Sequence, residues 1–285
     1  MLGDIIMRYT ASLWKSDELY VKMRYYFNYG KRLNLDSPSG YNEKCQWMKL
    51  YYHRQEMVVM VDKYAAKTWA ANKIGDEHIV PCYGVWDKAE DIGFDALPNQ
   101  FVLKCTHGCG GHFICKDKNT LDVNLVRKNF RKELRSSVYT QTREWPYKHV
   151  KPRIIAEQYL CEDDSGILTD YKFFCFNGVP RIMYMSKDGA STPHTDFFDM
   201  EWNHLPLRMR DPNSDVPPEK PKRFEEMVEI AKTLSEGWPH VRVDLYMVNG
   251  RIYFGEMTFF TLGGAVYFNP PSWNEIIGSW FQLSH

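Results

Sequence analysis

The sequence has 285 residues, of which 44% are hydrophobic, 15% aromatic and 25% charged, and these proportions exclude a disordered or fibrous chain. Lys and Arg total 36 and Asp and Glu also total 36, so the net charge is zero, which disfavours a general nucleic-acid binder. There is no run of about 18 apolar residues that would predict a membrane span, and residues 1–10 lack the apolar core of a secretion signal. Seven cysteines, an odd and scattered set, predict reduced thiols in a cytoplasmic protein.

The first part of the chain has helical composition. Apolar residues recur at helical spacing within 59–73, and Gly75 is typical of a helix end. Residues 42–53 are also predicted to be helical. We therefore expect a mostly helical N-terminal region over residues 1–78.

The middle of the chain alternates short apolar runs with glycine and polar segments. Strands are predicted at 79–85, 101–106, 113–116 and 153–160. Apolar residues at a spacing of four predict a surface helix over 121–136. We expect these elements to form one subdomain over residues 79–160.

The last part of the chain is dominated by two hairpins, each with an Asn-Gly turn. Their strands are predicted at 168–176, 180–186, 241–248 and 251–258. Residues 191–221 are rich in Pro, Asp and Asn and are predicted to be mostly loop, whereas 224–234 is predicted to be an amphipathic helix. We expect a second subdomain over residues 161–285. Since strands and helices are mixed without regular βαβ alternation, the expected fold class is α+β.

The last hairpin carries the most informative charged residues. Arg242 and Asp244 share one face of the first strand. A two-residue Asn-Gly turn would put Asp244 and Glu256 on opposite faces, whereas a three-residue loop starting at Val248 would put them on one face. We predict the three-residue loop, because it gathers two carboxylates and a guanidinium, and such oxygen ligands suit Mg²⁺ that is shared with phosphates. The alternative is a solvated face with a salt bridge between Arg242 and Glu256.

A second pattern places Lys104 near the end of an apolar strand, just before the glycine-rich run 107–111. Backbone N–H groups of such a loop can hold phosphates, and a strand lysine can reach an inner phosphate. An ordinary β-turn is the alternative. A zinc site is disfavoured because the spacing fits no zinc finger well; its ligands would be Cys105, His107, Cys109 and His112.

A third pattern is Glu157-Gln158-Tyr159-Leu160 at a strand end, followed by three acids at 162–164. Such a linker can offer backbone N–H and C=O groups to an adenine edge. The Glu157 carboxylate could accept from the adenine amino group, and an acid beyond it could bind ribose hydroxyls. The alternative is a surface strand with an acidic turn.

In this order, the lysine with its glycine loop, the linker and the charged hairpin resemble the ATP-grasp superfamily. Several further segments resemble its TupA-like branch, which is associated with teichuronopeptide and other surface-polysaccharide synthesis: 41–51, 62–65, 83–87, 151–157, 170–178 and 253–258. The resemblance runs from about residue 25 to 280. It implies two subdomains whose antiparallel sheets clamp ATP, preceded by the short helical region.

The resemblance implies ATP and Mg²⁺, with two ions, as cofactors. Asp244 and Glu256 match the metal ligands, and Thr258 stands where the family has Asn. A hydroxyl is a poorer ligand than an amide carbonyl, so one ion would be held more loosely. The implied ATP-binding residues are Lys63, Lys104, His107, Gly108, Gly110, Gly111, Glu157, Gln158, Leu160 and Asp164.

The resemblance also implies catalytic residues. Arg242 would steady the transferring phosphoryl group, and Lys172 would touch the γ-phosphate or an acyl phosphate. Lys187 is a weaker candidate for contact with substrate. The usual Asn-x-x-Pro-Gly ending is replaced by a run that ends in Gly263-Gly264, which we expect to reshape the acceptor pocket.

The implied activity is ATP-dependent carboxylate–amine ligation through an acyl phosphate. By resemblance, the amine is an amino acid or another amine, and the carboxylate belongs to a uronic acid of a capsule or cell-surface polysaccharide precursor. That sugar could be free, nucleotide-linked or lipid-linked. The alternatives are a sugar kinase with the same fold, and a glycosyltransferase or polysaccharide-binding protein.

Overall fold

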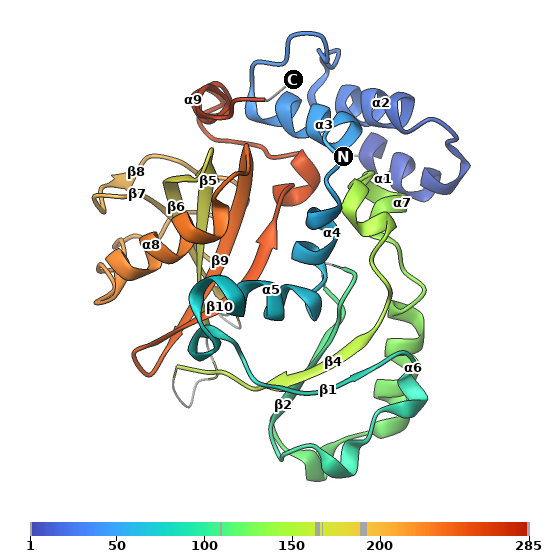
Figure 1. Cartoon of the computed structure of the whole chain (residues 1–285). Coiled ribbons are helices and arrows are strands. Elements are labelled where there is room, and N and C mark those ends of the chain that lie inside the picture. The colour runs from blue at the N-terminus through green and yellow to red at the C-terminus, as the bar shows by residue number, and fades with distance from the viewer. Residues whose placement is uncertain (1, 109, 163–165, 167, 189–192, 284–285) are drawn as a thin grey trace.

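The structure of the chain is a computed structural model that describes residues 2–108, 110–162, 166, 168–188 and 193–283. Two separate antiparallel sheets form the body of the molecule, and the first helices of the chain gather at one end of it (Figure 1). The two sheets face a common central region, so residues far apart in the sequence approach one another there (Figure 1).

The N-terminal part forms the helices α1 (Leu2–Tyr9), α2 (Asp17–Tyr29), α3 (Tyr41–Tyr51), α4 (Gln55–Val61) and α5 (Ala65–Ile74). The predicted single helix over 59–73 is wrong, because the chain breaks between α4 and α5. The break has a local cause: the Asp62 carboxylate accepts hydrogen bonds from the N–H groups of Tyr64 at 2.9 Å and Ala65 at 3.2 Å. These bonds satisfy donors that the start of a helix leaves unpaired.

One sheet has four strands in the order β1-β4-β2-β3, with the bounds β1 (Cys82–Trp86), β2 (Phe101–Cys105), β3 (His112–Cys115) and β4 (Ile154–Gln158). The helix α6 (Val123–Glu133) covers its outer face, where Phe130 packs with Phe101 and Leu103 in one apolar cluster. A short helix, α7 (Val138–Thr142), follows. The strands and the long helix predicted for this part are therefore confirmed, with differences only at their ends.

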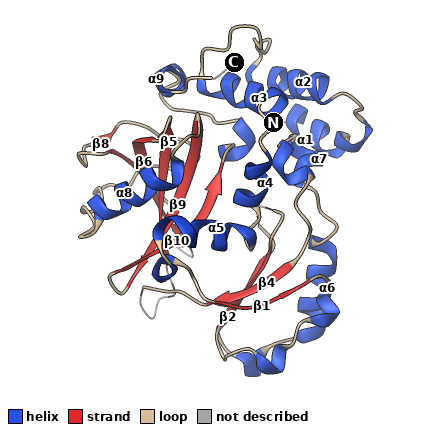
Figure 2. Cartoon of the chain, in the orientation of Figure 1, coloured by secondary structure: helices blue, strands red, loops and turns tan. Residues whose placement is uncertain are grey.

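The other sheet has six strands in the order β10-β9-β5-β6-β7-β8, with the bounds β5 (Leu168–Phe176), β6 (Val179–Asp188), β7 (Thr195–Asp199), β8 (His204–Leu205), β9 (His240–Val248) and β10 (Arg251–Thr258). The helix α8 (Phe224–Ser235) lies against it (Figure 2), and its buried Met227 and Leu234 join Phe173 in the largest apolar core. The last helix, α9 (Trp273–Trp280), contacts α3.

The described residues of 191–221 are mostly loop, as predicted, but they include the strand β7, which was not predicted. It pairs with β6 and with β8. Its residues 195–198 are all buried, so the sequence shows no alternation that would reveal a strand. The buried Asp196 carboxylate is satisfied by Ser214, whose hydroxyl donates at 2.7 Å. Pairing and burial in the folded chain, rather than a local pattern, therefore create this strand.

Two further expectations concern cysteines and membranes. The cysteines in the described ranges all carry free thiols, as their scatter predicts. In the same part of the chain, no helix combines the length and apolar character needed to span a bilayer. The division of the chain into domains at residues 78 and 160 stays a prediction.

Candidate active site

A cavity of about 530 Å³ lies between the two sheets, and its size is typical of a small-molecule site. Side-chain alternation explains the contribution of β2, because Phe101 and Leu103 face α6 and therefore direct Val102 and Lys104 into the cavity. The predicted site residues that line the cavity are Lys63, Lys104, Gly110, Glu157, Gln158, Leu160, Lys172, Asp244 and Glu256. The structure thus brings together residues from three distant parts of the sequence.

The turn of the last hairpin differs from the prediction. Asn249 and Gly250 form a two-residue turn with φ angles of 52° and 74°, and Val248 pairs with Arg251. Two successive left-handed residues are typical of the tight hairpin turn that Asn-Gly favours. The predicted three-residue loop is therefore wrong.

A bulge in β10 nevertheless places both carboxylates on one face. Phe254 pairs with Leu245, and the next pair is Glu256 with Asp244, so Gly255 is an extra residue in its strand. The extra residue shifts Glu256 onto the face of Asp244. Glycine is needed there, because a Cβ at position 255 would lie 2.9 Å from the carbonyl oxygen of Asp244.

Asp244 is fully buried and lies between two cations. The Nε and Nη2 atoms of Arg242 each donate to one of its carboxylate oxygens at 2.6 Å. Lys172, on β5, lies 2.9 Å from Asp244 and 2.8 Å from Asp170. Burial lowers the pKa of Arg242 and of Lys172, but the charge of Asp244 outweighs it and raises both pKa values above the ordinary range. Since Arg242 is only 7% exposed, the alternative of a solvated hairpin face is wrong.

Glu256 forms the more accessible half of the carboxylate pair, with a side chain 33% exposed. Lys63 reaches it at 2.6 Å from the break between α4 and α5, and Arg242 lies 3.4 Å away. The Thr258 hydroxyl donates to Glu256 at 3.2 Å and accepts from Arg242 at 3.2 Å. Burial raises the pKa of Glu256, but Lys63, Arg242 and Lys172 outweigh it and hold this pKa well below its usual range.

Glu157 forms ion pairs with two lysines. Its carboxylate lies 2.6 Å from Lys67 and 2.9 Å from Lys104. Burial raises the pKa of Glu157, but the two ammonium groups outweigh it and lower the pKa to about 2. Lys67 was not among the predicted site residues; it lies in the first turn of α5, four residues after Lys63. Lys67 also donates to the carbonyl of Val80 at 2.8 Å, next to the linker.

The linker after β4 forms one wall of the cavity. The backbone N–H of Gln158 donates to the carbonyl of Pro81 at 2.9 Å. Leu160 is buried in a small apolar cluster with Val80 and Val248. Tyr246 also lines the cavity and was not a predicted site residue, although it shares the strand face of Asp244.

The glycine-rich run contributes to the site unevenly. Gly110 lines the cavity with a φ of 98°, and Gly111 has a φ of 60°. His107 is only 4% exposed and is not among the lining residues, and burial lowers its pKa. Gly108 likewise lies outside the lining, and a Cβ added there would lie 3.8 Å from Val138.

Some predicted residues lie outside the described structure. Asp164 and Cys109 are among them, and so is the side chain of Lys187, whose backbone belongs to β6. Among the residues that are described, no three His, Cys, Asp or Glu side chains come together to hold a metal ion. A protein-only zinc site is therefore not found in that part of the chain.

Most of the chain is similar to known proteins. A family model described as "TupA-like ATPgrasp" matches residues 43–282. No curated protein matches the sequence significantly. Among solved structures, a D-alanine–D-alanine ligase from Helicobacter pylori is 12% identical, with a TM-score of 0.44 over 86% of this chain and 70% of its own.

Two other solved structures are similar over a smaller share of their own length. An L-amino acid ligase from Bacillus licheniformis is 11% identical, with a TM-score of 0.47 over 87% of this chain and 56% of its own. The ATP-grasp ligase PsnB, solved with a minimal precursor, is 8% identical, with a TM-score of 0.41 over 75% of this chain and 58% of its own. The chain thus spans little more than half the length of these two ligases.

The family match covers most of the chain and confirms both the resemblance and the fold expected from the sequence. Members of the ATP-grasp family are ATP-dependent ligases that form carbon–nitrogen bonds. The chain therefore belongs to the TupA-like ATP-grasp family.

Proposed function

We propose that this protein catalyses ATP-dependent carboxylate–amine ligation, in which the carboxylate is a uronic acid of a surface-polysaccharide precursor and the amine is an amino acid or another small amine. The observation that carries the proposal is the placement of Asp244 opposite Glu256 by the bulge at Gly255, within the cavity that also holds Lys104 and Lys172. The substrate class rests on the family branch alone.

The donor set fits Mg²⁺. Asp244 and Glu256 offer carboxylate oxygens from adjacent strands, and Mg²⁺ is commonly bound by one or two carboxylates together with substrate phosphates. Both residues would hold the ion, and the Thr258 hydroxyl lies beside Glu256. When bound, Mg²⁺ would neutralise charge on the triphosphate.

Lys172, which lines the cavity, and Arg242, which lies behind it on Asp244, would act on the transferred group. A substrate carboxylate attacks the γ-phosphorus of ATP and ADP departs, which leaves an acyl phosphate; an amine then attacks the acyl carbon, loses a proton and expels phosphate, which leaves an amide. Arg242 and Lys172 would stabilise the negative charge of the phosphoryl group in both steps. Their pairing with Asp244 holds them in place before substrate binds, which is the preorganisation such transfers require.

The remaining residues would bind the nucleotide. The backbone of the linker from Gln158 to Leu160 would meet the adenine, and Lys63 and Lys104 would meet the phosphates. The Glu157 carboxylate already accepts from Lys67 and Lys104, so we assign it to orienting these lysines rather than to the adenine amino group.

The first test is thermal stabilisation by nucleotides with and without Mg²⁺. A ligand that binds only the folded state raises the melting temperature. Mg²⁺ with ATP should stabilise the wild type, and UDP-sugars or GDP-sugars without a uronic acid should not. Glu256→Gln should melt below the wild-type temperature without ligand, because Lys63 loses its charged partner, and it should also lose the Mg²⁺-dependent part of the shift. Stabilisation by a nucleotide sugar and not by ATP would refute the ligase.

The second test is ADP release from ATP in the presence of uronic acids and amines. We expect release that requires one compound of each class, together with an amide product detected by mass spectrometry. ADP release with a sugar and without an amine, accompanied by a phosphorylated sugar, would instead identify a kinase.

A further inference from the structure

Helix α3 has a buried polar face that the proposed chemistry does not use. Asn42, Gln46 and Lys49 lie four and three residues apart, so they share one side of the helix; we call them the polar row. They are 3%, 6% and 3% exposed, respectively. Because side chains of these types are rarely buried without partners, the row must satisfy its polar atoms inside the protein.

The partners of the polar row are backbone groups of the loop that follows β10. The contacts run in order along helix and loop: Lys49 donates to the carbonyl of Gly263, Gln46 to that of Gly264, and Asn42 donates to the carbonyl of Val266 at 2.8 Å and accepts from its N–H at 2.9 Å. The row therefore binds the loop over several successive residues rather than at one point.

The loop needs this support because of its conformation. Leu262, Gly263 and Gly264 have φ angles of 51°, 67° and 64°, so three successive residues are left-handed. Leu262 has a Cβ, for which this region is unfavourable. A Cβ at position 264 would lie 2.7 Å from the Cβ of Cys45, so the loop backbone packs directly on α3.

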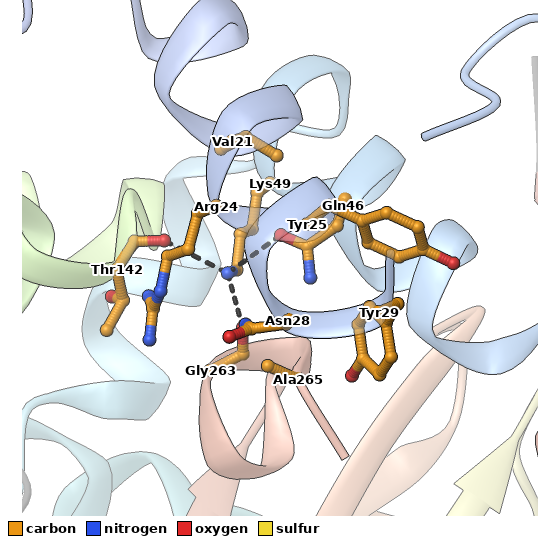
Figure 3. Close-up of a pocket in the computed structure, with 10 residues that line it drawn as sticks. All are labelled: Val21, Arg24, Tyr25, Asn28, Tyr29, Gln46, Lys49, Thr142, Gly263 and Ala265. Carbon is orange, nitrogen blue, oxygen red and sulfur yellow. Dashed lines mark hydrogen bonds between the residues drawn. The ribbon is translucent and has the colours of Figure 1, made fainter. Parts of the chain in front are cut away.

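Lys49 has the most extensive contacts of the row. Its ammonium group lies among three acceptors: the side-chain oxygen of Gln46 at 3.1 Å, the carbonyl of Thr142 at 3.0 Å and the carbonyl of Gly263 (Figure 3). An ammonium group has three N–H donors, so these acceptors use all of them. The cavity beside it holds only about 10 Å³, which is room for roughly one water molecule. These contacts suit Lys49 to holding the loop rather than to binding a substrate.

The same loop includes Thr261, which contacts the site. The Thr261 side chain is fully buried, and its hydroxyl oxygen accepts from Nη1 of Arg242 at 3.3 Å. The other nitrogens of Arg242 bind Asp244. Thr261 therefore contacts the side of the guanidinium group that the carboxylate does not.

We propose that the polar row positions Arg242, because it holds the loop in which Thr261 contacts the guanidinium group. The row acts through other groups and touches no reacting atom. The inference rests on the proposed ligase function for the role of Arg242, but the link from the row to Arg242 can be measured without substrate.

The test compares Lys49→Met with Lys44→Met. Both lysines belong to α3 and donate to backbone carbonyls, but Lys44 contacts Gly278 and Phe281 near the C-terminus instead of the loop. In hydrogen exchange at matched fractions of folded protein, Lys49→Met should speed exchange in a peptide covering 261–266 about tenfold. Lys44→Met should leave that peptide unchanged and speed exchange near α9.

A spectroscopic readout separates positioning of Arg242 from general support of the fold. The Nε–H resonance of Arg242, assigned in ¹⁵N-arginine-labelled protein by its loss in Arg242→Lys, should shift or broaden in Lys49→Met and stay in place in Lys44→Met. Thr261→Val removes the acceptor with little change of shape, and it should move the same resonance without loosening the loop. This variant keeps the test decisive if Lys49→Met does not fold.

Activity completes the test. Lys49→Met should bind Mg²⁺ with ATP within about twofold of the wild type yet release ADP at least tenfold more slowly. Unchanged loop exchange, an unmoved Arg242 resonance or wild-type turnover would each overturn the positioning role. If the wild type itself failed to bind ATP, the ligase function would fall and the catalytic part of the inference with it, whereas exchange and the resonance would still decide whether the row controls Arg242.

Discussion

The buried charges of the candidate site are balanced by opposite charges within a few ångströms. Glu157 lies between two lysines, and Asp244 is bound by Arg242 and Lys172. Removing one member of a buried pair typically costs about 3–5 kcal/mol, because the other charge is left unpaired. Substitutions at these positions therefore change stability as well as activity, and Glu256, a third exposed, is the cleaner position for testing chemistry.

His240 lies within the apolar core and must be uncharged there. The ring stacks on Phe176 with centroids 4.6 Å apart, and Nδ1 lies 3.0 Å from the carbonyl of Cys175. Since a carbonyl only accepts, Nδ1 carries the proton, and Nε2 is the acceptor for the Tyr41 hydroxyl at 3.0 Å. Burial lowers the pKa of His240 to about 3, so the folded protein requires the neutral ring.

This requirement predicts a specific loss of stability in acid. In the unfolded chain the pKa of His240 returns to about 6.5, so between that pH and about 3 the unfolded state binds the extra proton. The free energy of unfolding should therefore fall, as the pH is lowered through this window, by up to about 1.4 kcal/mol per pH unit from this group. Urea denaturation at pH 7 and pH 4.5 should show a smaller fall for His240→Phe than for the wild type. Equal falls would contradict the prediction.

At the scale of single elements, a bulge decides whether the last hairpin can form a site. The Asn249-Gly250 turn alone would leave the carboxylates of Asp244 and Glu256 on opposite faces, and the extra residue Gly255 corrects the register. Bulges are common next to active sites because they redirect a single side chain without disturbing the rest of the strand.

Gly255→Ala should therefore damage both stability and chemistry. The added Cβ would lie 2.9 Å from a backbone oxygen of β9, which cannot move without distorting the strand pair. We expect a loss of about 1–3 kcal/mol in urea denaturation together with a large loss of Mg²⁺-dependent ATP binding. Gly93→Ala is the matched control, because no atom lies within 4 Å of its added Cβ and its φ is −84°. Normal Mg²⁺-dependent binding by Gly255→Ala would show that the bulge is dispensable.

In the whole molecule, the candidate site is formed jointly by the N-terminal helical part and the two sheets. Lys63 comes from the helical N-terminal part, Lys104 from the four-stranded sheet and Glu256 from the six-stranded sheet. These cations and carboxylates meet across the cavity, so a ligand that bridges the sheets would replace some of their mutual contacts.

Binding of Mg²⁺ and ATP should therefore protect both sheets at once. In hydrogen exchange we expect slower exchange in peptides covering 101–105 and 154–160 and, equally, in those covering 240–258. The helix α9, which lines no part of the cavity, serves as the internal control. Protection confined to one sheet would contradict a site shared by the two.

The fold class, most of the strands and the residue types of the site can be predicted from the sequence, because these depend on local periodicity and on short patterns such as Arg242-x-Asp244. The motifs of the sequence also predict the family to which the chain belongs. The break before α5 was not predicted, because it depends on a single capping side chain, Asp62. The strand β7 was not predicted either, because it depends on pairing with β6.

The way in which the site is assembled can be seen only in the folded protein. The register of the last hairpin depends on a bulge at Gly255, which the local sequence does not predict. Lys67 contacts Glu157 only because α5 packs beside this residue in the folded protein. Likewise, nothing in the local sequence of α3 distinguishes the polar row. Its partners in the loop lie 214 to 224 residues later in the sequence. Contacts of this kind join distant residues, and short-range patterns carry no information about them.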